Sequence, residues 1–312
     1  MNFPFKVLPD KEFDAVGFGT NAVDYLIRVP EYPAFNSKME LETYIQAAGG
    51  EAASTMAGLQ RLGMKTAYVG RFGSDREGEF GLRSLTDEGV DVSMSERVPE
   101  TRTQVGFILI DGQSGERTVL WQRDKKLAYT AEDAPAEAAT RCKVLHITPH
   151  DTRACIKLAA AARSAGAIVS MDIDKVFEGV DELLPLVDIC IASADFPGRL
   201  LGVSGKRSAL REIRSRFGCS IVGLTLGISG SIVLCDDTFI ETPAFEVPGG
   251  CIDTTGAGDA FRTGFLHGML SGASVEESGR AANAVAALKC RGLGARTTLP
   301  TQIELKALLK NI

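Results

Sequence analysis

The most informative stretch of the chain is CIDTTGAGDAFRTGFLHGML, residues 251–270. Its apolar side chains recur at helical spacing and fall on one face, at Phe261, Phe265, Leu266 and Met269. The spacing predicts a helix that begins near Asp259, with the loop Gly256-Ala257-Gly258 leading into it. Such small residues let backbone N–H groups converge on an anion, and the helix N-terminus adds partial positive charge. The stretch therefore predicts a phosphate-binding loop.

Asp259 follows this loop directly, and two interpretations apply to it. An acidic residue at the start of a helix often caps it. A carboxylate held beside a transferring phosphoryl group is also suited to take the proton of an attacking hydroxyl group, as a general base. We consider the loop residues Gly256, Ala257 and Gly258, together with Asp259, as a candidate catalytic group.

Upstream of this stretch, short apolar runs alternate with helical patterns. Strands are expected at residues 143–148, 167–173, 188–192 and 219–226, and helices at 152–165 and 206–217. This rhythm is typical of an α/β fold whose parallel sheet is covered by helices on both faces. Residues 231–235 and 239–242, joined through Asp236-Asp237, predict a hairpin.

The first third of the chain is different, because several extended segments follow one another. Strands are expected at residues 14–19 and 23–29, an extended stretch at 39–45, and two strands around the turn DGQSGE, residues 111–116. We predict a single α/β domain over residues 1–312, with a small β-sheet inserted from about residues 20–47 and 101–125.

Composition excludes several classes of partner. The 312 residues carry a formal net charge of −6, so no long-range field attracts nucleic acid or an anionic membrane. No stretch approaches 18 uninterrupted apolar residues, and the first residues lack a signal-peptide core. Seven widely spaced cysteines without a CxxC pair predict buried thiols in a reducing cytoplasm.

Two separated motifs resemble the signatures of the PfkB family of carbohydrate kinases. Asp253-Thr-Thr-Gly-Ala-Gly-Asp259 is similar to the second signature. Residues 48–63, AGGEAASTMAGLQRLG, followed by YVGRFGSDREGEFG, resemble the first. The resemblance implies a ribokinase-like three-layer α/β/α core with a mainly parallel sheet and a small β-sheet lid. It also implies an ATP-dependent transferase that phosphorylates a primary hydroxyl group of a small sugar.

The same resemblance assigns roles on the acceptor side. It makes Asp259 the catalytic base and the backbone N–H groups of residues 255–258 the anion hole. Asp24 matches an aspartate that binds sugar hydroxyls, although a turn Asp between two strands is the alternative. Gly49 and Gly50 match a glycine pair that lies against the sugar, and Ser54 stands where family members ordinarily carry a sugar-binding Asn.

On the nucleotide side, residues 225–230, TLGISG, resemble the family's turn along the ATP phosphates, which assigns Thr225, Gly227 and Gly230 to nucleotide binding. Asn283 matches a position that flanks the adenine, although helical periodicity also allows an exposed Asn283. Gly294 belongs to the loop 292–295 beneath the base.

Metal ions are part of the same expectation. ATP brings Mg²⁺. The family's Asn-x-x-Glu segment is replaced after residue 192 by Ser193-Ala-Asp195-Phe-Pro. In some family members a monovalent cation binds near the residue that matches Asp253, so the resemblance admits K⁺ there.

The inserted sheet is expected to close over the sugar as a lid and to form a homodimer through its exposed edges. Arg123 either leans over the substrate or is a solvated charge of the lid. His146 and His150 end a strand that faces the cleft, so either contacts substrate or is a structural residue.

Two alternative functions stay open, and the residues that follow its motif disfavour a third. In the first alternative, the same kinase chemistry acts on a nucleoside instead of a sugar. In the second, the protein is a sensor that binds nucleotide or sugar without turnover. Residues 17–22, GFGTNA, resemble a dinucleotide-binding fingerprint, but the fingerprint requires a helix directly afterwards, and VDYLIRVPEYP is β-branched and interrupted by proline.

Overall fold

The computed structural model describes residues 1–113 and 117–310 of the chain. A central sheet has eight strands in the order β14-β13-β12-β11-β10-β9-β1-β4. These strands are β1 (Phe13–Phe18), β4 (Thr66–Val69), β9 (Cys142–Ile147), β10 (Ile168–Ile173), β11 (Ile189–Ser193), β12 (Ile221–Thr225), β13 (Ser231–Cys235) and β14 (Thr238–Thr242). Neighbours pair in parallel from β4 to β12, and the predicted hairpin β13–β14 adds two antiparallel strands. The predicted α/β architecture is confirmed.

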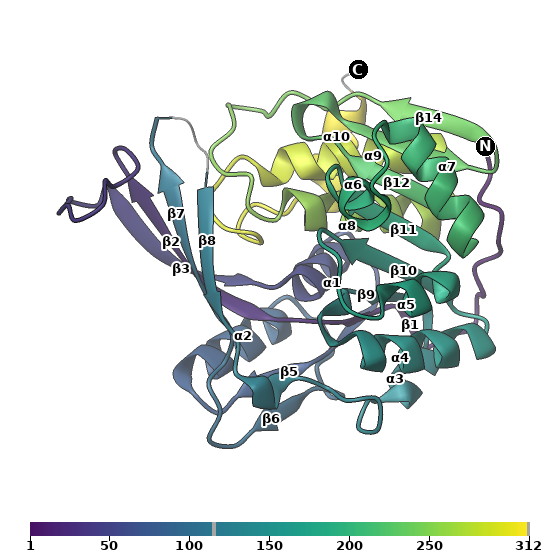
Figure 1. Ribbon diagram of the computed structural model, residues 1–312, viewed down its shortest axis with the longest axis horizontal. Helices are drawn as coiled ribbons and strands as arrows, with labels where there is room; N and C mark the ends of the chain where they lie inside the picture. Colours follow the sequence, from purple (N-terminus) through teal and green to yellow (C-terminus); the bar gives the residue numbers. More distant parts are fainter. Residues whose placement is uncertain (114–116, 311–312) are drawn as a thin grey trace.

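Helices cover both faces of this sheet (Figure 1). One face carries α1 (Glu51–Arg61), α2 (Arg76–Thr86), α8 (Ala257–Leu270), α9 (Val275–Lys289) and α10 (Gln302–Lys310). The other carries α3 (Ala136–Thr140), α4 (Thr152–Ser164), α5 (Val180–Leu183), α6 (Phe196–Leu201) and α7 (Lys206–Phe217). Successive strand residues enter opposite cores, as the alternation of side chains along a strand requires. In β1, for example, Ala15 belongs to the same core as Met56 and Phe265, whereas Val16 belongs to the core that contains Leu158.

A second, four-stranded sheet projects from one side of the core (Figure 1). Its order is β3-β2-β7-β8, formed by β2 (Ala22–Val29), β3 (Thr43–Gly49), β7 (Val105–Asp111) and β8 (Arg117–Gln122). We call it the lid sheet. The short strands β5 (Arg71–Gly73) and β6 (Glu96–Val98) pair separately. The strands of the lid sheet come from the two segments whose apolar residues show no helical periodicity. Along each strand these apolar residues alternate between the two faces of the sheet.

Some details differ from the expectations. The extended segment predicted at residues 39–45 becomes a strand from Thr43 onward. The predicted turn 111–116 lies partly outside the described residues, at positions 114–116. Six cysteines are buried, but Cys251 is exposed, so the expectation of seven buried thiols is wrong at that position. Within the described residues, every helix is too short or too polar to cross a membrane.

Candidate active site

The predicted anion loop lies at the N-terminus of α8. Gly256 is the residue before the helix and has a φ of 76°, and a Cβ atom there would lie 2.7 Å from the Cβ of Ala295. Both conditions favour glycine. The backbone N–H of Thr255 donates to Asp253, and that of Ala257 donates to the carbonyl of Thr254. Within the described residues, the N–H groups of Gly256 and Gly258 donate to no protein acceptor, so both are free to donate to a ligand.

Asp259 lies in the first turn of α8 and is partly buried. Burial raises its pKa to about 7, and the nearby carboxylate of Asp172 adds to this effect, whereas Arg262 and Arg296 oppose it. A carboxyl group with a pKa near neutrality can both accept and release a proton at physiological pH.

A buried ion pair lies beside Asp259. Arg262, one turn further along α8, is 4% exposed and contacts Asp172 at the end of β10, with 2.6 Å between Nη2 and Oδ1. The same nitrogen donates to the carbonyl of Ile191 at 2.9 Å. The pair places a fixed cation and a fixed anion next to the candidate base. Neither residue was among the site residues predicted from the sequence.

On the acceptor side, the Asp24 carboxylate lies against the backbone of two glycines. A Cβ atom on Gly49 would come within 2.0 Å of Asp24 Oδ2, and one on Gly106 within 2.7 Å of Oδ1. Gly50 has a φ of 90°, and a Cβ atom there would come within 2.5 Å of Thr20 O. Burial raises the pKa of Asp24 to about 6, against the opposing charge of Arg296. The turn-Asp alternative is wrong, because Asp24 lies within strand β2. Its carboxylate lies where the lid sheet meets the core.

Arg296 joins the predicted acceptor residues to one another. Its buried guanidinium donates to Ser54 Oγ and Ser84 Oγ, each at 3.1 Å, and to the carbonyl of Gly49. Ser54 is fully buried and holds the guanidinium through its hydroxyl group. Arg296 was not among the site residues predicted from the sequence. Its partners lie more than 200 residues earlier in the chain, so no local pattern reveals them.

Glu51 and His150 contact each other near the carboxylates of Asp172 and Asp259. Burial raises the pKa of Glu51 well above its ordinary value, and the charges of Asp172 and Asp259 add to this. His150 Nδ1 lies 3.6 Å from Glu51 Oε2, and its ring packs edge-on against Phe177. Burial lowers the pKa of His150 to about 4, so the imidazole is neutral at physiological pH.

The remaining candidates of this region are structural. His146 is fully buried, with Nδ1 at 3.2 Å from Ser170 Oγ, and burial lowers its pKa to about 3. Arg123 donates to both carboxylate oxygens of Asp151 at 2.8 Å and is mostly buried. Neither expectation for Arg123 matches this ion pair, which ties the end of the lid sheet to the start of α4.

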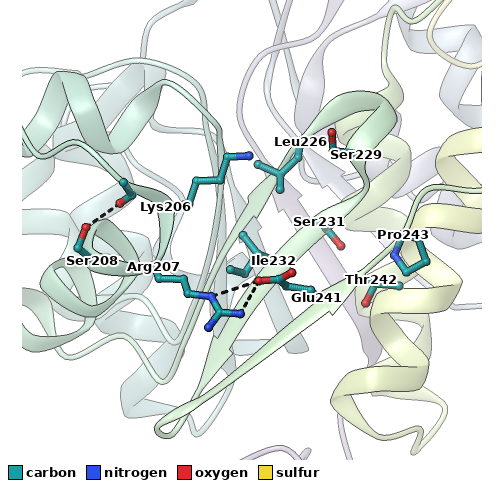
Figure 2. Close-up of a pocket in the computed structure, with 11 residues that line it drawn as sticks. Lys206, Arg207, Ser208, Leu226, Ser229, Ser231, Ile232, Glu241, Thr242 and Pro243 are labelled. Atoms are coloured by element: carbon teal, nitrogen blue, oxygen red, sulfur yellow. Dashed lines mark hydrogen bonds and ion pairs between the residues drawn. The ribbon is translucent and has the colours of Figure 1, made fainter.

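Three of the predicted nucleotide-binding residues, Thr225, Gly227 and Gly230, lie where β12 turns into β13. Thr225 ends β12, and the turn is closed by hydrogen bonds between Leu226 and Gly230 and between Gly230 and Gly227. Gly227 and Gly230 have φ values of 57° and 88°. Beside the turn lies a cavity of about 680 Å³, bounded by Leu226, Ser229, Pro243 and the start of α7. Figure 2 shows Lys206 pointing toward Leu226 there, while Arg207 bonds Glu241 at the rim.

Asn283 is 6% exposed, so the alternative of an exposed side chain is wrong. Its amide nitrogen donates to Ser231 Oγ, Thr242 O and Gly279 O at 3.0–3.3 Å. The side chain therefore fastens α9 to the β13–β14 hairpin. Gly294, with a φ of 91°, donates its N–H to Asp253 Oδ2 at 2.8 Å and brings its loop against the start of the second signature.

Asp195, at the position of the departing Asn-x-x-Glu segment, lies at the start of α6 with its side chain largely exposed. Within residues 1–113 and 117–310, no three His, Cys, Asp or Glu side chains are placed to hold a metal ion together.

The chain resembles known proteins over nearly its whole length. The model of the pfkB family carbohydrate kinases matches residues 16–302. A nucleoside kinase of Methanothermobacter thermautotrophicus is 29% identical over 92% of each chain, and an ATP-dependent ribose-1-phosphate kinase of Halopiger xanaduensis is 29% identical over 92% of this chain and 94% of its own. The structure of Arabidopsis thaliana ribokinase complexed with ribose and ATP superimposes with a TM-score of 0.82, at 25% identity, over 96% of this chain and 99% of the other.

Proposed function

Because this chain belongs to the pfkB family of carbohydrate kinases, we propose that it transfers the γ-phosphoryl group of ATP to a primary hydroxyl group of a small sugar, with Asp259 as general base. The family consists of phosphotransferases that act on sugars or nucleosides. The observation that carries the proposal is the position of a partly exposed carboxylate, with a pKa of about 7, directly beside a helix N-terminus with free N–H groups.

In this mechanism Asp24 orients the acceptor by accepting hydrogen bonds from its hydroxyl groups. The backbone of Gly49 and Gly50 forms the wall against which the sugar lies. Asp259 accepts the proton of the attacking hydroxyl group as the new oxygen–phosphorus bond forms. The N–H groups of Gly256 and Gly258 hold the negative charge that grows on the transferred group.

Arg296 acts as the internal counter-ion of this pocket. Two carboxylates, Asp24 and Asp259, face the acceptor, and the guanidinium of Arg296 lowers the pKa of both. Its hydrogen bonds to Ser54, Ser84 and Gly49 hold it behind the acceptor surface. Ser54 therefore supports a cation, a different task from that of the family's sugar-binding amide.

The residues around the anion loop fit a triphosphate. The buried Thr255 Oγ1 has no protein partner within the described chain, and the loop N–H groups converge at the end of α8. Mg²⁺, when bound with ATP, neutralises part of the phosphate charge.

The lid sheet is proposed to close over the acceptor and to form a homodimer through its outer face. Tyr25 stacks on Phe107 with ring centroids 5.3 Å apart, and Phe107 pairs across the sheet with the exposed Leu120. An exposed aromatic face of this kind is typical of an interaction surface.

A nucleoside is the second candidate acceptor, favoured by Trp121. In the lid sheet, Asp24 pairs with Gly106 and Gly106 pairs with Trp121, so the indole lies on the same face as the Asp24 carboxylate. Trp121 is 56% exposed, and Lys175 Nζ lies over its ring at 5.3 Å from the centroid, so a planar base would stack on the part of the ring that Lys175 leaves exposed. Trp121→Ala would then reduce kcat/KM for nucleosides much more than for free sugars.

An acceptor panel with an Asp259 variant tests the proposal. ATP consumption is measured with free sugars, sugar acids, sugar phosphates and nucleosides, and products are identified by mass spectrometry. We expect Asp259→Asn to lower kcat on the best acceptor by about 10² to 10⁴-fold. Asp237→Asn, on an exposed turn, is the matched control and should keep full activity. Full activity of Asp259→Asn would refute the mechanism, and binding without any phosphorylated product would favour a sensor.

A further inference from the structure

Lys289 is a buried cation beside the anion loop. It is the last residue of α9, and its side chain has no exposed surface. Its ammonium group donates to the backbone carbonyl of Asp253 at 2.7 Å and lies 3.7 Å from Asp253 Oδ2. Asp253 begins the motif that ends at Asp259, so only Thr254 and Thr255 separate the partner of this cation from the anion loop.

The Asp253 carboxylate organises both loops that border the site. Oδ1 accepts the N–H of Thr255, and Oδ2 accepts the N–H of Gly294, each at 2.8 Å. Burial alone would raise the pKa of Asp253, but the Lys289 ammonium and these hydrogen bonds hold it below its ordinary value. The two loops are therefore positioned by one anion whose counter-charge is Lys289.

The place expected for K⁺ is thus already filled by protein groups. A monovalent cation would need the carbonyl and carboxylate oxygens of Asp253 as ligands, and the ammonium contacts both groups. Burying an ammonium group costs several kcal/mol unless oxygen partners compensate. Here a carbonyl, a carboxylate and the negative end of α9 provide that compensation. The residues around Asp253 do not fit an additional cation.

We propose that the Lys289 ammonium is a built-in cation that positions the anion loop in place of a monovalent metal ion, so that turnover needs no K⁺. The inference rests on the proposed kinase function and makes Lys289 a positioning residue, since it acts through Asp253 and the loop. The cation holds the carbonyl and carboxylate of Asp253 in the orientation that fixes Thr255, and thereby the N–H groups of Gly256 and Gly258.

The first test compares the wild-type kinase in KCl and in choline chloride at the same ionic strength, about 0.1 M. With the best acceptor of the panel, we expect kcat to agree between the two salts. Activation of the wild-type enzyme severalfold by K⁺ over choline would overturn the proposal. This arm needs no variant, so it holds even if the Lys289 variants fold poorly.

The second test removes the cation. We expect Lys289→Ala to lose about tenfold or more in kcat, because the loop donors lose their fixed geometry. KCl or methylammonium chloride should restore much of this loss, whereas choline chloride should not. A purely structural lysine would show no such selective rescue. An unrescued loss would therefore also overturn the proposal.

Thermal unfolding gives a readout that does not depend on turnover. The Tm of Lys289→Ala should be higher in KCl than in choline chloride, and the Tm of the wild-type protein should be equal in the two. Lys143→Met is the matched control, because Lys143 pairs with Asp14 at 2.7 Å away from the loop, and its loss should create no K⁺ response. If no acceptor is phosphorylated, the proposed function fails, and the melting comparison still decides the role of Lys289.

Discussion

The acceptor side and the nucleotide side of the candidate site are built from different materials. On the proposed acceptor side, the polar groups are the charged side chains of Asp24, Asp259 and Arg296, and burial raises the pKa values of both carboxyl groups. On the proposed nucleotide side, the backbone forms the site, at Gly230 and Gly256, whose φ angles are positive. Side-chain chemistry can be altered residue by residue, whereas backbone shape is shared by any sequence that keeps the glycines. The acceptor side is therefore where specificity and pH dependence should reside.

The largest expected effect is on the buried charge pair of the acceptor side. Arg262→Met leaves Asp172 buried without its partner, which should lower the free energy of unfolding by about 3–5 kcal/mol. Urea denaturation followed by circular dichroism measures this loss. Combining Arg262→Met with Asp172→Asn removes both charges and should recover part of the stability. Additive losses in the double variant would contradict the pairing.

On the nucleotide side, a single methyl group should be enough to disturb the turn. Gly230→Ala places a Cβ atom 2.0 Å from Thr242 O at a φ of 88°, a strain of about 1–3 kcal/mol before the clash is relieved. We expect the KM for ATP to rise about tenfold while the acceptor KM changes little. Gly227→Ala is the matched control.

At Gly227 a Cβ atom would meet no atom within 4 Å, and its φ of 57° is left-handed helical. That substitution should therefore cost only about 1–2 kcal/mol. Steady-state kinetics with each substrate varied in turn distinguishes the two glycines. If Gly230→Ala raised the KM for ATP and the KM for the acceptor equally, the proposed division into a backbone-built nucleotide side and a side-chain-built acceptor side would be wrong.

The same division explains what the sequence could predict. The glycines and Asp259 lie in short motifs, and the alternating strands and helices set the core sheet, so both were accessible from local pattern. Arg296 and Lys289 were not, because a basic residue in a loop or a last helical turn is ordinarily solvated, and their partners come from distant segments. Arg262 carried a usable signal, since it is charged within an otherwise apolar stretch of α8. Asp172 also ends a fully buried strand.

The pH profile tests the electrostatics of the acceptor side. Asp259 must be ionised to accept a proton, and burial raises its pKa to about 7, so kcat/KM should fall about tenfold per pH unit below pH 7. Arg262 and Arg296 lower this pKa, whereas Asp172 and Asp24 raise it. Arg296→Gln should therefore move the acid limb to higher pH, and Arg296→Lys should move it less. An unchanged acid limb in Arg296→Gln would remove Arg296 from its proposed role.

Stability should respond to pH in the opposite direction. A carboxyl group whose pKa is raised on folding favours the folded state while it stays protonated, and that contribution is lost as pH rises. For Asp24 and Asp259, with pKa values of about 6 and 7, the loss should run from about pH 4, the unfolded pKa, to about pH 7. Asp24→Asn and Asp259→Asn should each flatten the dependence, as measured by urea denaturation across this range.

The smallest expected effect lies where the two sides meet. Arg117, the first residue of β8, donates to Thr254 Oγ1 at 2.5 Å and so joins the lid sheet to the segment before the anion loop. The bond is exposed and should contribute only about 0.5–1.5 kcal/mol. We expect Arg117→Ala to raise both KM values by a similar factor of about three, because the contact serves the acceptor side and the nucleotide side together. Arg28→Ala, which removes the lid-sheet pair with Glu42, should leave both unchanged. A rise confined to the acceptor KM would assign Arg117 to the lid alone.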